Sequence, residues 1–135
     1  MTLADILALH RGKEGPLLPI LHDVQGAFGH VSEDQIREIA KALNLTRAEV
    51  YGVVSFYHDF RSEADARPVI KLCRAEACQA RGVDMLVAKM AAQDRVKIES
   101  VYCLGLCSVG PAALVGGDVH ARLDGAKFAA LVAAQ

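Results

Sequence analysis

The sequence predicts an α+β protein, with an N-terminal helical bundle over residues 1–66 and a β-α-β-β-α domain over residues 67–135. Two Ser/Thr-x-x-Gln/Glu capping boxes precede apolar residues of helical period in the first part. A β-branched run and an alternating run enclose a helical segment in the second part. The polar stretch Arg61–Pro68 continues neither pattern, so it marks the boundary between two domains.

Four helices are expected in the first part, because each has a start or a stop signal. Thr2 can cap a short helix, and a second helix begins near Pro16, where proline suits the first turn, and ends at Gly29. The capping boxes Ser32–Gln35 and Thr46–Glu49 open the third and fourth helices. The residues expected to face the core are Leu17, Ile20, Leu21, Val24 and Phe28 in the second helix, Ile36, Ile39, Ala40 and Leu43 in the third, and Val50, Val53, Val54 and Tyr57 in the fourth.

The second part changes from a helical period to a mixture of strands and helices. The expected elements are strands at Val69–Leu72, Val96–Tyr102, Pro111–Val115 and Asp118–Arg122 and helices at Arg81–Ala92 and Leu123–Ala134. Gly116-Gly117 is a hairpin turn signal between the last two strands. The order β-α-β-β-α matches a thioredoxin-like layout.

Composition argues against nucleic-acid and membrane partners. The net charge is -1 and 5% of residues are aromatic, so the chain lacks the positive charge that attracts phosphate backbones and has few rings for stacking bases. The longest uncharged run, Ser100–Gly117, contains four glycines and one proline, which predicts loop and strand and no direct membrane insertion. The N-terminus has no leader pattern, so the four cysteines are expected to be reduced thiols in the cytoplasm.

The four cysteines follow two of the expected strands. Cys73 comes directly after Val69–Leu72, with Cys78 in the next loop, while Cys103 follows Val96–Tyr102, with Cys107 in its loop. If the two strands are neighbours in the sheet, both loops leave the same edge and four sulfurs converge. Four convergent thiolates need a metal, so this spacing predicts a metal centre.

The cysteine spacing separates several kinds of site. A purely structural role in the core would explain a single buried cysteine better than it explains two pairs of cysteines in loops. A thiol-disulfide exchanger would use C-x-x-C at a helix start, which is absent. Structural zinc sites use ligand pairs separated by two to four residues, so the cysteine spacing alone is also compatible with a zinc site. An iron-sulfur cluster fits best, although the plant-type C-x4-C-x2-C spacing is absent.

The motifs resemble those of a known family. CRAEACQARG, YCLGLCSVGPAALVGG and the GVxxFYxxF run at Gly52–Phe60 are similar to the thioredoxin-like 2Fe-2S ferredoxin family. That family includes the small iron-sulfur subunit of NADH:quinone oxidoreductase. Within it, the stretch Cys73–Gln79 most resembles the gamma subunit of soluble, cytoplasmic NAD-dependent formate dehydrogenases.

The resemblance implies a non-catalytic electron-transfer subunit. One 2Fe-2S cluster would be bound by Cys73, Cys78, Cys103 and Cys107, serving as both the cofactor-binding and the metal-ligating residues. FMN and NAD would sit on a partner flavoprotein, and a larger subunit would hold molybdenum or tungsten. The chain itself has no G-x-G-x-x-G and no G-x-x-x-x-G-K-[ST] motif. The alternatives are the equivalent subunit of NADH:quinone oxidoreductase or of an NAD-linked hydrogenase, or a zinc-stabilised scaffold module. Whether the cluster relays electrons or stores them remains open.

Three further expectations concern residues outside the ligand set. Arg74, adjacent to a ligand, is a candidate cation for stabilising the reduced cluster, and N–H groups between Leu104 and Gly110 can point at sulfur. The histidines are expected at the surface or at helix ends; they are His10, His22, His30, His58 and His120. The aromatic group of the fourth helix is expected to be core more than interface; it consists of Tyr51, Phe56, Tyr57 and Phe60.

Overall fold

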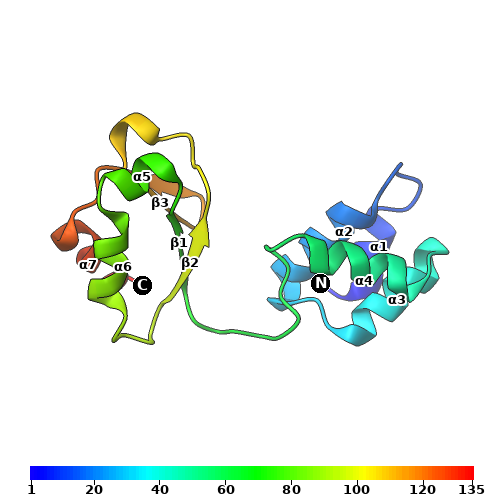
Figure 1. The fold of residues 1–135 in the computed structure, drawn as a ribbon. Helices are drawn as coiled ribbons and strands as arrows, with labels where there is room; N and C mark the ends of the chain where they lie inside the picture. The colour runs from blue at the N-terminus through cyan, green and yellow to red at the C-terminus, as the bar shows by residue number, and fades with distance from the viewer. The chain divides into compact units, whose positions relative to one another are not determined.

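Figure 1 shows a computed structural model that describes residues 1–135. The chain divides into two compact units, Met1–Ala66 and Arg67–Gln135. Each unit has a hydrophobic core of its own. The first unit is entirely helical and the second contains the sheet, so the expected α+β class is confirmed.

The first unit contains four helices, which are α1 (Leu3–Leu9), α2 (Leu17–Phe28), α3 (Glu33–Leu43) and α4 (Arg47–Phe56). Both expected capping boxes are formed, with Ser32 and Thr46 at the N-caps of α3 and α4. Thr2 caps α1 and forms a third box with Asp5. Gly29 ends α2 in the left-handed conformation, as the stop signal predicts.

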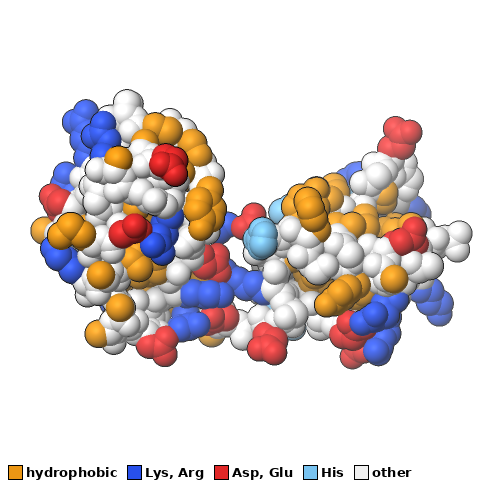
Figure 2. Space-filling view, viewed as in Figure 1, with side chains coloured by type: hydrophobic (Ala, Val, Ile, Leu, Met, Phe, Trp, Pro, Cys, Tyr) orange, Lys and Arg blue, Asp and Glu red, His pale blue; other side chains and the backbone are white.

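The core of the helical unit is formed by the apolar faces of all four helices. Its largest fully buried side chains are Ile6, Ile20, Leu21, Val24, Val31, Ile39 and Val50. Two core expectations were wrong, since 37% of Phe28 and 42% of Tyr57 are exposed. Phe28 is the last residue of α2, and Tyr57 is the C-cap of α4 with extended backbone, so the helical period no longer directs either ring inward. Figure 2 shows apolar side chains on the surface of both units.

The second unit has a four-stranded sheet and three α-helices. Its elements are β1 (Val69–Cys73), α5 (Glu76–Ala80), α6 (Val83–Met90), β2 (Lys97–Val101), the 3-10 turn η1 (Cys107–Val109), β3 (Ala113–Val115), β4 (Asp118–His120) and α7 (Gly125–Ala133). The strand order is β2-β1-β3-β4. Strands β1 and β2 are parallel, and the other pairs are antiparallel, so the expected β-α-β unit and hairpin are both present.

The core of the second unit lies between the sheet and the helices α6 and α7, which lie together beside it (Figure 1). Ile70 and Leu72 of β1, Val83 of α6 and Phe128 of α7 are fully buried there. The helix α5 was not expected as a separate element. Its N-cap, Ala75, has no side chain that can cap, so the sequence carries no local start signal for it. No helix of the protein combines the length and apolar character needed to cross a membrane.

Candidate metal centre

The sheet brings the two cysteine loops to one edge. Cys73 is the last residue of β1 and pairs in register with Val101, the last residue of β2. The Arg74 N–H donates to the Val101 carbonyl at 2.8 Å, which ties the two strand ends together. Cys103 follows two residues later in the left-handed conformation, with φ of 73°. The carboxyl ends of neighbouring parallel strands therefore place the two loops side by side.

The other two cysteines come from short helical turns. Cys78 lies in α5, which corrects the expectation that it lies in a loop, and Cys107 opens the turn η1. The buried side chain of Cys78 thus comes from a short helix that follows β1 closely. The four cysteines are free thiols.

The thiols form two pairs. The sulfurs of Cys103 and Cys107 are 3.7 Å apart, and the thiols of Cys73 and Cys78 hydrogen-bond to each other. The pairs also interact, because a charge on Cys107 raises the pKa of Cys78 and a charge on Cys73 raises that of Cys107. No group of three or more His, Cys, Asp or Glu side chains is gathered around a single point. The two thiol pairs would together supply the four thiolates that a 2Fe-2S cluster needs as ligands.

The two pairs differ in burial. Cys73 and Cys78 are 2% and 3% exposed and belong to the hydrophobic core, whereas Cys103 and Cys107 are exposed. A cluster bound by all four would therefore have one side in the core and one side toward the surface.

The pKa values of the thiols follow from their surroundings. Burial raises the pKa of the Cys73 thiol, but hydrogen bonds from the N–H groups of Ala75, Cys103 and Leu104 and from Cys78 outweigh it, so the pKa lies below its ordinary value. Burial, followed by the Cys73 thiol, raises the pKa of Cys78. The hydrogen bond with Cys103 raises the pKa of Cys107. Protons thus compete with a metal for Cys78 and Cys107, and metal binding releases them.

Backbone groups complete the surroundings of the sulfurs. The Leu104 N–H was among the donors expected from the second loop, while those of Ala75 and Cys103 were missed. A Cβ placed on Gly110 would lie 3.0 Å from the Cys78 sulfur, closer than about nine in ten real Cβ contacts. Four thiols, N–H donors aimed at sulfur and a glycine that leaves room beside it fit the demands of an iron-sulfur cluster.

Other residues singled out in the sequence lie elsewhere. The guanidinium of Arg74 binds the Asp84 carboxylate on α6, with its Nη2 2.7 Å from Oδ1, so a carboxylate offsets its charge. Of the aromatic group, Phe60 is 8% exposed, but 49% of Tyr51 and 73% of Phe56 are exposed, so the expectation of a core cluster was wrong for most of its members. Tyr51 and Phe56 both lie on α4, whose buried residues are Val50 and Val54.

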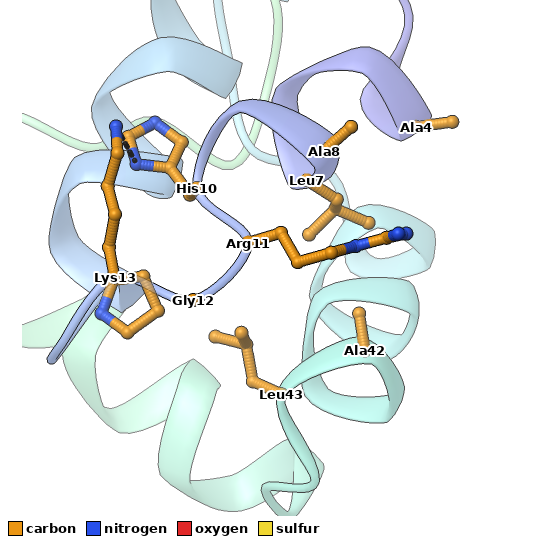
Figure 3. Close-up of a pocket in the computed structure, with 10 residues that line it drawn as sticks. Ala4, Leu7, Ala8, His10, Arg11, Gly12, Lys13, Ala42 and Leu43 are labelled. Carbon is orange, nitrogen blue, oxygen red and sulfur yellow. Dashed lines mark hydrogen bonds between the residues drawn. The ribbon is translucent and has the colours of Figure 1, made fainter.

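His10 lies at a helix end, as expected, but it is buried. It is the C-cap of α1 but only 8% exposed, and its Nε2 lies 2.6 Å from the Asp23 carboxylate. Lys13 Nζ lies 3.4 Å from its Nδ1. Figure 3 marks this contact between Lys13 and His10 with a dashed line. His10, Lys13 and Arg11 line a cavity of about 650 Å³ in the helical unit, which contains none of the cysteines.

Fold and site together define an electron-carrier type of domain, a thioredoxin-like sheet with four paired thiols at one edge. The sequence profile described as "Thioredoxin-like [2Fe-2S] ferredoxin" matches residues 3–135. The chain belongs to this family, and its cofactor is one 2Fe-2S cluster.

Curated proteins and solved structures agree with the family. The chain is 30% identical over 122 residues to the NADP-reducing hydrogenase subunit HndA of Solidesulfovibrio fructosivorans, covering 82% of this chain and 71% of HndA. It is 27% identical over 136 residues to a subunit of the NADH-quinone oxidoreductase of Rhizobium meliloti, covering 93% of this chain and 81% of the relative. It matches the structure of an H2-reduced NAD+-reducing [NiFe]-hydrogenase with a TM-score of 0.71 and 29% identity, covering 87% of this chain but only 22% of that chain.

Proposed function

We propose that this protein is the electron-transfer subunit of a multisubunit, cytoplasmic NAD-dependent formate dehydrogenase. In this proposal Cys73, Cys78, Cys103 and Cys107 hold the cluster, and residues 67–135 form the domain that carries it. The chain exchanges single electrons with FMN on a partner flavoprotein that binds NAD(H). A larger partner holds molybdenum or tungsten and oxidises formate.

The observation that carries the proposal is the pair of thiols that follows each of two neighbouring parallel strands at the same edge of the sheet. When bound, a 2Fe-2S cluster supplies a centre that accepts and returns one electron. The protein supplies the four thiolates, aims N–H groups at Cys73 and keeps the Cys73–Cys78 side away from water. The chain has no nucleotide-binding motif, which supports placing the hydride chemistry on a partner.

The choice of parent complex rests on the stretch Cys73–Gln79, which resembles formate dehydrogenase gamma subunits. A second candidate is a hydrogenase or NADH-quinone oxidoreductase. It is favoured by the names of HndA, the Rhizobium relative and the NAD+-reducing hydrogenase. All three parents share the coarser function, in which this chain passes electrons within an NAD(P)H-linked complex.

The parent complex can be identified by purifying it through a tag on this chain under anaerobic conditions. We expect the preparation to reduce NAD with formate, to contain FMN and to contain molybdenum or tungsten. Reduction of NAD with hydrogen instead, together with nickel, would assign the chain to a hydrogenase. The isolated chain should not bind NADH, and saturable NADH binding by the chain alone would contradict the subunit assignment.

A further inference from the structure

A second arginine lies beside a proposed cluster ligand. Arg81 is the C-cap of α5, three residues after Cys78, so the two share a face of the same short helix. A Cβ on Gly110 would lie 3.0 Å from the Cys78 sulfur and 3.5 Å from Cδ of Arg81. Both atoms are therefore within 3.5 Å of a single point, and the guanidinium begins one bond beyond Cδ.

Arg81 differs from Arg74 in its partners. Arg74 is held by the Asp84 carboxylate, so the two side chains act on the cluster as a pair of opposite charges. The Arg81 side chain forms no ion pair or hydrogen bond in the structure, and Glu76, the acidic residue of α5, is not bound to it. The exposed Arg81 side chain, whose stem lies near Cys78, thus has no carboxylate at ion-pair distance.

We infer that Arg81 sets the reduction potential of the cluster by stabilising its reduced form, which rests on the proposed ligand role of Cys78. Reduction adds one electron and no proton, so the cluster and its four thiolates become more negative by one charge. A cation near the cluster that has no carboxylate partner favours that state, although exposure to solvent weakens the attraction. Arg81 is a tuning residue and neither a ligand nor a catalytic residue.

A purely structural role for Arg81 predicts something different. A cation at the C-terminus of a helix interacts favourably with the helix dipole, and the Arg81 stem packs beside Gly110. Loss of that role would lower stability or cluster loading. It would leave unchanged the potential of those clusters that do form.

The test is an EPR-monitored redox titration of the full chain carrying its cluster. We expect Arg81→Gln to lower the reduction equilibrium constant about threefold, a shift of about 30 mV to more negative potential for a one-electron couple. Arg81→Lys should stay closer to the wild type, since it keeps the charge. Arg81→Met keeps the apolar stem and should shift as Arg81→Gln does.

Two control variants neutralise other arginines of the chain. Arg95→Gln removes a positive charge at the opposite end of β2 and should leave the potential near that of the wild type. The double variant Arg74→Gln/Asp84→Asn removes a charge pair and should also have little effect.

An unchanged potential in Arg81→Gln and Arg81→Met would overturn the inference while leaving the proposed function intact. Loss of the cluster from both variants, with full loading of Arg81→Lys, would also overturn it by assigning Arg81 to assembly. A wild-type chain without a 2Fe-2S signal would instead overturn the proposed function, and with it the inference.

Discussion

The two units of the chain differ in what completes their cores. The core of the helical unit consists of apolar side chains such as Ile39 and Val50. Three of its helices, α1, α3 and α4, begin with capping boxes. The core of the second unit includes two thiols, Cys73 and Cys78, at the sheet edge where the cluster is proposed. The core of the helical unit contains no cysteine.

This difference links the stability of the second unit to its cofactor. A group that binds the folded chain and not the unfolded chain stabilises the folded chain by mass action. The ligands must also lose protons, which the raised pKa values of Cys78 and Cys107 oppose until iron binds. Removing the cluster should thus loosen one unit and leave the other unchanged.

The largest effect is expected from changing the cysteines. Cys78→Ser and Cys107→Ser should each remove most of the cluster, as measured by iron content and visible absorption. In the cluster-free chain only Cys78→Ser should lower the stability of the second unit further, by roughly 1–3 kcal/mol, because a hydroxyl replaces a thiol in the core. Cys107 is exposed, so its change should cost little there.

Chemical unfolding of the cluster-free variants measures this asymmetry. Equal destabilisation by the two substitutions would contradict the division into a buried and an exposed pair. Full cluster occupancy in either variant would contradict the ligand assignment.

Truncation of a core side chain should separate the two units. Ile39→Ala should destabilise the helical unit by roughly 2–5 kcal/mol, since it leaves a cavity among fully buried residues. Leu72→Ala, the matched change in β1, should destabilise the second unit to a similar extent and reduce cluster loading. Helix content during thermal unfolding and iron content give the two readouts. Loss of iron from Ile39→Ala would show that the units are coupled.

A smaller effect is expected from Gly110→Ala. The new methyl group would lie 3.0 Å from the Cys78 sulfur and must displace it, so cluster loading should fall. Gly117→Ala is the control, because nothing lies within 4 Å of its Cβ position. Iron content after reconstitution compares them, and equal loading of both variants would show that the sulfur has room to move.

The smallest effect is expected from Thr46→Ala. Loss of the N-cap of α4 should destabilise the helical unit by about 1 kcal/mol, because the Glu49 N–H loses its acceptor. Urea unfolding measures the change, and the visible spectrum of the cluster should not alter. A change in the spectrum would contradict the separation of the two cores.

The sequence is most informative where structure is decided locally. Capping boxes at Ser32 and Thr46 and the left-handed stop at Gly29 involve residues within one turn, so the pattern alone predicts them. The helix containing Cys78 has no such signal, because five residues without a capping side chain carry no periodicity. The hydrogen bonds from Ala75 and Cys103 to Cys73 depend on how two loops meet.

The sequence is misleading where tertiary partners decide the outcome. Arg74 is adjacent to a proposed ligand, but its partner Asp84 lies ten residues further along the chain. Tyr57 continues the apolar spacing of α4, yet the helix ends before it and the ring is exposed. His10 ends a helix, as expected, but packing against α2 gives it Asp23 and buries it.

In the proposed arrangement, the two thiol pairs at the sheet edge hold one 2Fe-2S cluster. The most direct test of this arrangement is metal and sulfide analysis of the anaerobically purified full chain, with visible and EPR spectra of the same sample. We predict two irons and two sulfides per chain, a brown oxidised form and an EPR signal that appears on one-electron reduction. A colourless chain with one zinc and no sulfide would contradict the assignment of a 2Fe-2S cluster to these thiols.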